Sequence, residues 1–322
     1  MTECSRHCAS AWGQSCVLES RDLLSLVDLT PVDIDAILDR ARRAKKDPDL
    51  FSTSLKGRQV ALIFEKPSTR TRVSFEAAVT SQGGHAIVLR SDELQLGRGE
   101  TIEDTGRVLS RYVDAIVVRT FGQDRLERLA EAASVPVVNA LSDLEHPCQG
   151  LADLQTILEK HGRLEGIVLT YVGDGNNVAH ALMLGGTMMG MEVRIAAPPS
   201  YEPFPRVVDQ CRQIGADTGG IVTVTNDPRV AAKGANVLYT DVWTSMGQEA
   251  ENDERKRALV EFQLNRDLVL LAAKDVIVMH CLPAHRGEEI TADVIDGPRS
   301  VVWDEAENRL HSQKALLTYL LQ

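Results

Sequence analysis

Residues 60–79 read VALIFEKPSTRTRVSFEAAV, an apolar run followed by a polar turn and a helix-like segment. The run at 60–64 suits a strand that is buried on both faces, as in a parallel sheet. The segment from residue 73 onward has helical spacing and good helix formers. A strand that passes directly into a helix is the repeating unit of α/β folds, so this stretch decides the fold class.

The polar turn within this stretch concentrates hydrogen-bond donors at the start of the helix: Ser68, Thr69, Arg70, Thr71 and Arg72. Unpaired backbone N–H groups and the positive end of the helix dipole favour an anion at that position. Arginine adds a planar fork of donors that matches phosphate oxygens. A helix cap needs only one hydroxyl group. Because the turn holds more donors than capping requires, it predicts a phosphate site.

Strand-like and helix-like segments alternate along the rest of the chain. Apolar runs that suit strands lie at 60–64, 86–89, 115–118, 135–138, 167–172, 193–196, 222–224, 237–239 and 276–279. Helical spacing is found at segments such as 33–46, 102–112, 124–134 and 150–161. This alternation predicts an α/β fold with doubly wound parallel sheets. Since the pattern restarts after 150–161, we expect two such domains with a cleft between them.

Composition limits the classes of function. The chain has 322 residues and a net charge of −11, which argues against general binding to nucleic acids or to anionic membranes. No apolar stretch reaches transmembrane length, and the N-terminus lacks the apolar core of a signal peptide. Six irregularly spaced cysteines do not resemble a disulfide framework. We therefore expect a cytoplasmic protein with reduced thiols.

Residues 1–18 differ in composition from the rest of the chain. They contain residue types that bind zinc, at Cys4, His7, Cys8 and Cys16. Their spacing fits no standard zinc finger, so we expect a disordered tail rather than a metal site. Neither a strong metal motif nor a Walker motif occurs elsewhere in the sequence. We expect no metal and no cofactor.

Polar clusters follow the expected strands at the points where those strands end. In open parallel sheets, ligands bind at the carboxyl ends of the strands, so these clusters should share one edge. We therefore expect the active site in the cleft between the two halves. The clusters are 68–72, Arg119, Asn139, 146–149, 173–177, 241–247 and 280–283.

The residue types in these clusters indicate a group transfer. The first half offers donors for an anion and for a carbonyl oxygen: Arg70, Arg119, His146 and Gln149. The second half offers groups that suit the ammonium and carboxylate of an amino acid: Asn177, Asp241 and Ser245. A phosphorylated electrophile beside an amine predicts group transfer to nitrogen.

Three alternatives compete with this interpretation. Gly173 and Gly175 follow a strand as in a dinucleotide-binding loop, but Val178 occupies the third glycine position, and no acid ends the next strand. A non-catalytic anion-binding protein of the same fold remains open. Cys281 could act as a nucleophile with His280 as its base, but neighbours in a strand point to opposite faces.

From about residue 20 to its end, the chain resembles the ornithine carbamoyltransferases. The Ser-Thr-Arg-Thr-Arg group at 68–72 and the His-Pro-x-Gln group at 146–149 resemble the carbamoyl-phosphate signature shared with the aspartate enzymes. The more specific motifs are Asp-x-x-x-Ser-Met-Gly at 241–247 and His-Cys-Leu-Pro at 280–283, which resemble the ornithine branch. The loop at 91–100 lacks the Ser-Lys arrangement of the aspartate enzymes.

The resemblance implies a binding site for carbamoyl phosphate. The residues that would contact it are Ser68, Thr69, Arg70, Thr71, Arg119, His146, Gln149, Cys281, Leu282 and Arg309. Gln95 matches a position that family members supply to the phosphate site of a neighbouring subunit. The resemblance therefore implies a homotrimer, or a multiple of trimers, with shared active sites. The role of Arg72 could be structural.

The resemblance also implies the second substrate and the domain limits. The residues that would bind L-ornithine are Asn177, Asp241, Ser245 and the Met246 backbone, with Cys281 beside the δ-amine. The final helix would cross back to the first domain. The carbamoyl-phosphate domain would then comprise 19–150 and 305–322, and the ornithine domain 151–304, linked by two helices. A loop around 242–262 is expected to close over ornithine.

The implied reaction gives L-citrulline and phosphate, most simply in arginine biosynthesis. The neutral δ-amine would attack the carbamoyl carbon, and an oxyanion would form beside Arg119, His146 and Thr71. The implied catalytic residues are Arg119, His146, Asp241 and Cys281. Putrescine or N-acetylornithine are alternative acceptors. Putrescine would leave Asn177 and Asp241 without a partner, and an acetylated amine would not suit an acid, so both considerations favour free ornithine.

Overall fold

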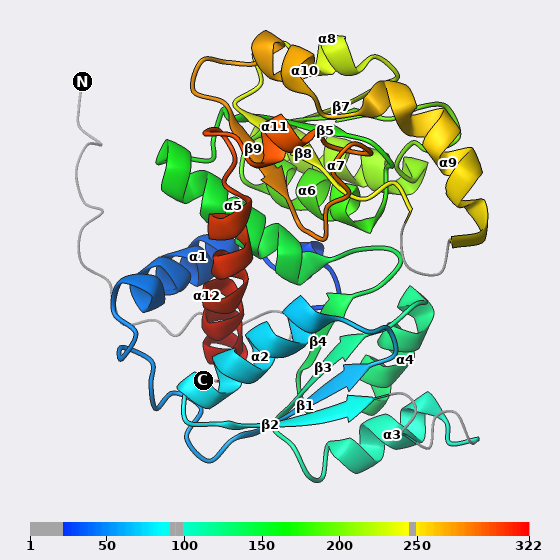
Figure 1. Ribbon diagram of the computed structural model, residues 1–322. Coiled ribbons are helices and arrows are strands. Elements are labelled where there is room, and N and C mark those ends of the chain that lie inside the picture. The colour runs from blue at the N-terminus through cyan, green and yellow to red at the C-terminus, as the bar shows by residue number, and fades with distance from the viewer. Residues whose placement is uncertain (1–21, 91–93, 95–98, 245–248, 322) are drawn as a thin grey trace, which may run out of the picture.

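The computed structural model describes residues 22–90, 94, 99–244 and 249–321, which form two parallel β-sheets with helices on their faces (Figure 1). The first sheet has the strand order β2-β1-β3-β4. Its strands are β1 (Gln59–Phe64), β2 (His85–Arg90), β3 (Ala115–Arg119) and β4 (Val137–Leu141). The predicted α/β class with doubly wound parallel sheets is confirmed.

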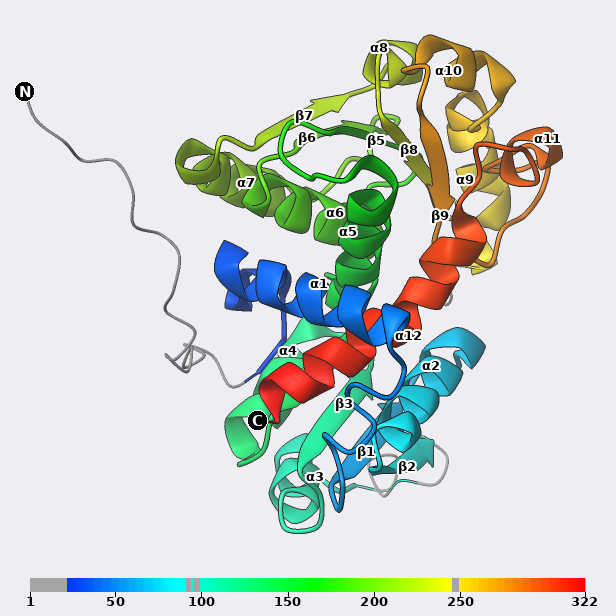
Figure 2. The ribbon, with the colours of Figure 1, turned by 90° about the vertical axis from the view of Figure 1, so that its left-hand side faces the viewer.

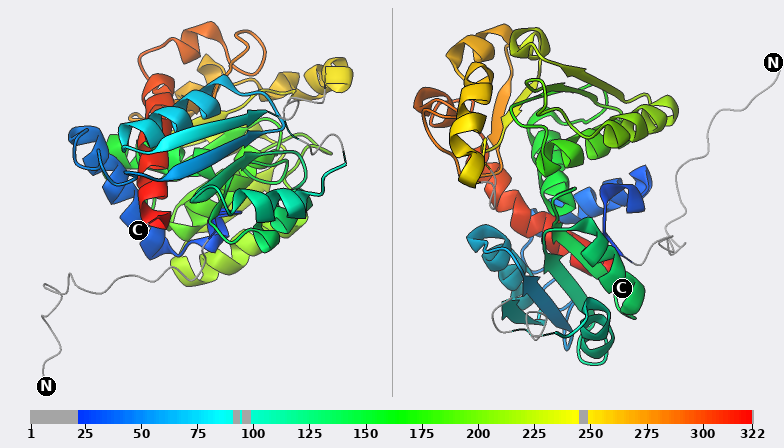
Figure 3. Two further views of the ribbon diagram at one scale, coloured as in Figure 1. Left: turned by 90° about the horizontal axis from the view of Figure 1, so that it is seen from below. Right: turned by 90° about the vertical axis from the view of Figure 1, so that its right-hand side faces the viewer.

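Alternate side chains of β1 face different helices, which is why this strand is apolar throughout. Val60 and Leu62 join a core with Phe75 of α2 (Thr69–Ser81). Ala61 and Ile63 join a second core, which includes residues of α3 (Ile102–Leu109) and α4 (Gln123–Ala132). Burial on both faces is typical of a parallel strand. The view from below in Figure 3 shows helices on both sides of this sheet.

The second sheet has the strand order β7-β6-β5-β8-β9 and is also parallel. Its strands are β5 (Val168–Val172), β6 (Glu192–Ala196), β7 (Ile221–Thr225), β8 (Val237–Thr240) and β9 (Ile277–His280). Its helices are α6 (Asn177–Met188), α7 (Pro205–Thr218), α8 (Pro228–Ala232), α10 (Arg266–Leu271) and α11 (Ala292–Ile295). Among the described residues, no helix combines the length and apolar character needed to cross a membrane.

Two long helices, α5 (Pro147–His161) and α12 (Val302–Leu320), run between the sheets, and α1 (Pro31–Lys46) lies across α12 (Figure 2). Helix α12 also packs against α5 and α2. One apolar core continues from β1 through Leu151 and Leu154 of α5 to Leu169 of β5. From this packing we propose that residues 305–322 complete the first domain.

Two segments differ from the sequence-based expectation. Asn139 lies within β4 rather than after it, and its Nδ2 donates to the Leu24 carbonyl oxygen at 2.8 Å, so it supports the strand instead of facing a ligand. The expected loop at 242–262 is helical from Glu249 onward: η3 (Glu249–Glu251), α9 (Asn252–Leu259) and η4 (Val260–Phe262). Acidic residues begin α9 and basic residues end it, which complements the helix dipole. These charges therefore stabilise a helix within the segment that was expected to be a loop.

Candidate active site

The predicted polar clusters come together at the topological switch point of each sheet. Strand order reverses between β1 and β3 in the first sheet and between β5 and β8 in the second. Crevices form at such points because the connections leave to opposite faces. The 68–72 turn follows β1, Arg119 ends β3, residues 173–177 follow β5, and Asp241 follows β8.

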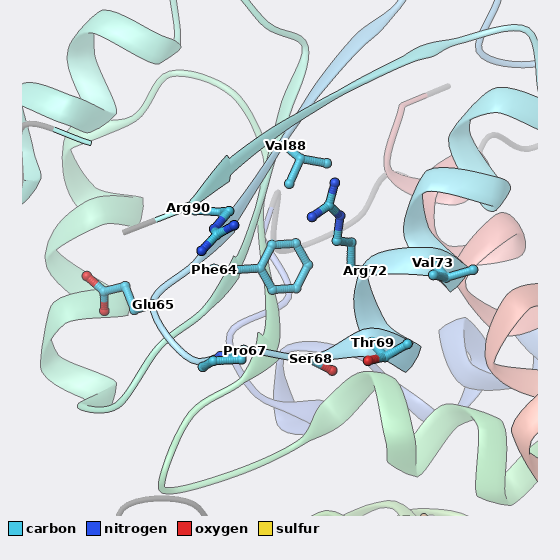
Figure 4. Close-up of a pocket in the computed structure, with 9 residues that line it drawn as sticks. All are labelled: Phe64, Glu65, Pro67, Ser68, Thr69, Arg72, Val73, Val88 and Arg90. Atoms are coloured by element: carbon cyan, nitrogen blue, oxygen red, sulfur yellow. The ribbon is translucent and has the colours of Figure 1, made fainter. Parts of the chain in front are cut away.

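The start of α2 borders a pocket of ≈ 600 Å³ (Figure 4). Ser68 is the N-cap residue, and its side chain accepts a hydrogen bond from the Thr71 backbone N–H at 3.2 Å. Arg72 pairs with Glu76 on the next turn at 2.9 Å, which agrees with a structural role for this arginine. Further residues that line the pocket are Phe64, Glu65, Pro67, Thr69, Val73, Val88 and Arg90.

The guanidinium groups of Arg70, Arg119 and Arg309 lie near one another. None of them forms an ion pair with a carboxylate among the described residues. Burial, together with the positive charges of Arg309 and Arg70, lowers the pKa of Arg119 to about 10. The Nε atoms of Arg119 and Arg309 are buried and make no hydrogen bond in the described part of the chain. Guanidinium groups that lack a directly paired carboxylate are costly to bury, so this cluster favours binding of an anion.

Arg309 connects α12 to the two helices that begin at the site. Its Nη2 donates to the Thr71 hydroxyl oxygen at 2.9 Å, and its Nη1 donates to Gln149 Oε1 at 2.7 Å. The Thr71 hydroxyl accepts this bond and therefore keeps its own proton for another acceptor. The arrangement holds a guanidinium, a hydroxyl and an amide around one space.

His146 is the residue before α5 and is buried. Burial lowers the pKa of its ring well below the ordinary value of 6.5, and Arg309, Arg119 and Arg70 add to this effect. The ring is therefore neutral at physiological pH. Its Nδ1 has no hydrogen-bond partner in the described structure. A neutral imidazole with a free nitrogen can donate to a carbonyl oxygen without bringing a further charge.

Asp241 forms the opposite wall of the site. Its Oδ1 accepts from Cys281 Sγ at 3.0 Å, and its Oδ2 accepts from Asn176 Nδ2 at 2.8 Å. Burial and the Asp241 charge raise the pKa of the Cys281 thiol well above its usual value, so the thiol is protonated and weakly nucleophilic. Cys281 is thus a donor to Asp241.

The His280 ring is hydrogen-bonded to groups other than the Cys281 thiol. Its Nδ1 accepts from the Leu282 backbone N–H at 2.9 Å, so Nε2 carries the proton and donates to Glu289 Oε1 at 3.2 Å. Leu282 itself has φ +58 and a cis peptide bond to Pro283. Asp241, His280 and Cys281 offer ligand atoms within 4.8 Å of one another, but these atoms are already engaged with protein partners. The residues present are not arranged as a free metal site.

Asn177 connects the two halves directly. Its Nδ2 donates to the Ser142 carbonyl oxygen at 2.6 Å. The nearby Gly175 has a packing role, because a Cβ on this residue would lie 2.3 Å from the Pro203 nitrogen. This close approach explains the glycine without a dinucleotide. The predicted site residues Gln95, Ser245 and Met246 lie outside the described residues.

The structure adds a buried ion pair behind Asp241 that the sequence did not reveal. Arg255 of α9 pairs with Asp174 at the end of β5 and donates to the Trp243 carbonyl oxygen at 2.7 Å. Its guanidinium carbon also lies 4.9 Å from the centre of the Tyr201 ring. These contacts anchor α9 to the strand ends. In the sequence, Arg255 belongs to a charged run, which gives no sign that one member turns inward.

A second group that the sequence did not reveal surrounds Gln149. Gln149 Nε2 donates to Asp153 Oδ1 at 2.8 Å and to Glu305 Oε1 at 3.2 Å. Tyr239 OH reaches both carboxyl groups, at 3.2 Å and 3.0 Å. Asp153 is four residues after Gln149, and Glu305 is four residues before Arg309. Helical neighbours at this spacing share a face, which is the signal that could have identified them.

Comparison with known proteins agrees with this geometry. Residues 21–159 match the family model for the carbamoyl-P binding domain of aspartate/ornithine carbamoyltransferase, and residues 165–320 match the Asp/Orn binding domain. The ornithine carbamoyltransferase of Acidothermus cellulolyticus is 60% identical over 301 residues, covering 94% of this chain and 96% of the relative. The enzyme of Parafrankia sp. is 59% identical over 307 residues, covering 94% and 97%.

Solved structures show the same fold. The ornithine carbamoyltransferase from Pyrococcus furiosus superposes with a TM-score of 0.89 at 55% identity, covering 92% of this chain and 96% of that one. The anabolic enzyme from Campylobacter jejuni gives a TM-score of 0.88 at 36% identity, covering 93% and 98%. Both family models and these relatives span nearly the whole chain. The protein therefore belongs to the aspartate/ornithine carbamoyltransferase family.

Proposed function

We propose that this protein transfers the carbamoyl group of carbamoyl phosphate to the δ-amine of L-ornithine, giving L-citrulline and phosphate. The observation that carries the proposal is the cluster of Arg70, Arg119 and Arg309, which lacks a carboxylate partner in the described structure and faces Asp241 across the site. An anion would pair with the three arginines, and an ammonium group would pair with Asp241. The relatives named ornithine carbamoyltransferase support the same pair of substrates.

In this proposal, carbamoyl phosphate binds at the start of α2 and at the three arginines. Its phosphate accepts from the α2 N-terminus, from Ser68 and Thr69, and from the Arg70 guanidinium. Its carbonyl oxygen accepts from Arg119, from the neutral His146 and from the Thr71 hydroxyl. Its amino group donates to Gln149 Oε1 and to the Leu282 carbonyl oxygen. Arg309 orients both Thr71 and Gln149 through the two hydrogen bonds described above.

Ornithine binds on the opposite side of the site, at Asp241 and its neighbours. Its α-ammonium group pairs with Asp241, and its α-carboxylate accepts from Asn177 and the Met246 backbone. Ser245 completes this contact. Asn177 now donates to the Ser142 carbonyl oxygen, so ornithine would replace an existing hydrogen bond between the two halves. The Arg255 anchor then keeps α9 in place beside the bound amino acid.

The reaction follows from these contacts. The neutral δ-amine attacks the carbamoyl carbon, and negative charge develops on the carbonyl oxygen between Arg119, His146 and Thr71. Donors fixed in a buried site stabilise such charge without reorganising. The C–O bond to phosphate then breaks, and the attacking nitrogen gives one proton to the departing phosphate. The resulting hydrogen phosphate stays paired with Arg70 and the helix terminus. Cys281 lies by the δ-amine as a neutral thiol, so we assign it a positioning contact and no nucleophilic step.

We also propose a role in arginine biosynthesis within the cytoplasm, since relatives from two organisms carry the description anabolic. A homotrimer would let Gln95 of one subunit reach the phosphate site of the next. The pocket at the start of α2, which is lined in part by Pro67, Ser68 and Thr69, would receive this contact (Figure 4). Analytical ultracentrifugation tests this assembly, and a monomer that is fully active would contradict it.

One assay tests the proposed reaction. The purified protein is incubated with carbamoyl phosphate and, in parallel, with ornithine, putrescine, N-acetylornithine or aspartate. Rapid citrulline formation with ornithine alone supports both the carbamoyl-phosphate and the ornithine binding assignments. Faster transfer to another amine would retain the carbamoyl-phosphate half and reject the ornithine half. Tight binding of carbamoyl phosphate without transfer to any amine would indicate a non-catalytic anion-binding protein.

A further inference from the structure

The side-chain amide of Gln149 has a single orientation that its neighbours permit. Its Nε2 lies between two carboxyl oxygens, 2.8 Å from Asp153 Oδ1 and 3.2 Å from Glu305 Oε1. Its Oε1 lies 2.7 Å from Arg309 Nη1. The reversed amide would place an oxygen against two carboxyl groups and an NH₂ group against a guanidinium. The first change sets an acceptor against acceptors, and the second sets a donor against a donor. The network therefore selects one amide orientation.

The two carboxyl groups are themselves held from both halves of the protein. Glu305 Oε2 accepts from the His280 backbone N–H at 2.8 Å, and Tyr239 OH contacts both acids. Asp153 lies on α5 and Glu305 on α12, whereas Tyr239 and His280 belong to β8 and β9. Both acids are buried, at 0% and 1% exposure. Such a fully bonded buried network is rigid, and it fixes the side chains that it contacts.

The protonation of the pair is compatible with this arrangement. Burial raises the pKa of Asp153 to about 7 and that of Glu305 well above its ordinary value, so the pair retains a proton at neutral pH. Two ionised carboxylates would repel each other at this depth. The remaining negative charge lies close to Arg309, whose guanidinium favours the ionised form of Asp153.

We propose that Asp153 and Glu305 are positioning residues that hold Gln149 with its carbonyl oxygen toward the substrate. The pair thereby selects a carbamoyl group, which has an NH₂ donor, over acyl phosphates that lack one. This inference rests on the proposed function, in which Gln149 accepts from that NH₂ group. A carbonyl oxygen accepts two hydrogen bonds, and Arg309 fills only one of them on Gln149 Oε1.

The substitutions differ in whether they preserve this orientation. Asp153→Asn preserves it, because Oδ1 can still accept from Gln149 while Nδ2 donates to the Tyr239 oxygen. Asp153→Ala removes one acceptor. Glu305→Gln places an NH₂ group against either Gln149 Nε2 or the His280 N–H, so it breaks the network at nearly constant volume. Glu307→Gln is the matched control, since Glu307 is half-exposed on the same helix and pairs with Lys45.

Two measurements separate positioning from general damage. The first is kcat/KM for carbamoyl phosphate at saturating ornithine, and the second is the inhibition constant of acetyl phosphate, which carries a methyl group in place of NH₂. Glu305→Gln and Asp153→Ala should lower kcat/KM about tenfold, the equivalent of one hydrogen bond to the substrate, and change the acetyl phosphate constant less than twofold. Asp153→Asn and Glu307→Gln should match the wild type.

A double substitution adds a second criterion. If Glu305 acts through Gln149, the Gln149→Ala/Glu305→Gln variant should be no more impaired than Gln149→Ala alone. Additive losses, or equal losses for carbamoyl and acetyl phosphate, would overturn the proposal. If Glu305→Gln does not fold, the comparison of Asp153→Ala with Asp153→Asn decides in the same way. An inactive wild type would instead refute the proposed function, whereas an active wild type with unaltered variants refutes only the positioning role.

Discussion

Replacing Glu145 by glutamine should stabilise the protein at alkaline pH. Glu145 precedes His146 and is buried, and its Oε1 accepts from the Leu26 backbone N–H at 2.9 Å while Oε2 pairs with the Ser25 hydroxyl. Burial raises the pKa of its carboxyl from 4.5 to about 7. A glutamine can keep both hydrogen bonds, because its oxygen accepts from Leu26 and its NH₂ group donates to Ser25.

The magnitude follows from the two pKa values. In the unfolded chain the carboxyl ionises near 4.5, whereas in the folded protein it keeps its proton up to about 7. The unfolded state therefore loses the proton first, and Glu145 destabilises the fold progressively as pH rises from 4.5 to 7. The penalty is absent below 4.5 and complete above 7. A pKa difference of about 2.5 corresponds to roughly 3 kcal/mol.

Urea unfolding at pH 5 and at pH 8.5 measures this effect. Between these two values, the wild type should lose about 2–3 kcal/mol of unfolding free energy relative to Glu145→Gln. Glu127→Gln, on the exposed face of α4, should follow the wild type at both pH values. Parallel pH dependences for the wild type and Glu145→Gln would refute the reasoning, because the carboxyl would then titrate alike in both states.

Four further predictions concern the site itself. Arg119→Ala should lower kcat on the order of 10²–10³-fold without lowering the thermal midpoint, because an oxyanion donor is lost and a buried charge is removed; near-normal turnover would contradict its assignment. The kcat/KM for ornithine should rise toward alkaline pH, because a lysine-like amine with a pKa near 10.4 must lose a proton before it attacks. His146 should add no titration above pH 6.5, since burial lowers its pKa, and a flat pH profile would contradict the prediction. Iodoacetamide at pH 8 should alkylate Cys281 at least about tenfold more slowly than free cysteine, as measured by peptide mass spectrometry, because the thiol pKa is raised; equal rates would reject the neutral thiol. Arg255→Ala should leave Asp174 buried and unpaired and should speed proteolysis within 249–262. It should also raise the KM for ornithine and leave the KM for carbamoyl phosphate constant; two unchanged KM values would exclude the anchoring role.

The sequence determines most of the secondary structure because parallel strands are apolar on both faces. Val60 to Phe64 and Ile277 to Met279 stand out as short apolar runs, and both are strands. The fourth strand was placed too early, since Pro136 lies before β4 and the strand continues through the polar Asn139. That asparagine is paired with a backbone carbonyl from residue 24, and such long-range partners leave no local pattern.

The candidate site was predictable where chemistry follows a strand end. Arg119 and Asp241 occupy the expected edge, at the ends of β3 and β8. Asp153 and Glu305 were missed because an acid within a helix usually indicates a solvated face. Only the packing of α5 against α12 shows that both acids are buried. Arg255 was missed for the same reason.

The three arginines also bear on the order in which the proposed substrates would bind. Ornithine is a cation at neutral pH, so guanidinium groups without a directly paired carboxylate oppose its approach. If carbamoyl phosphate binds at these arginines as proposed, it would reverse that local sign and favour the amino acid as the second ligand. After transfer, citrulline has no net charge and would leave at little electrostatic cost. Phosphate would remain as the counter-ion, which makes inorganic phosphate the expected competitor of carbamoyl phosphate.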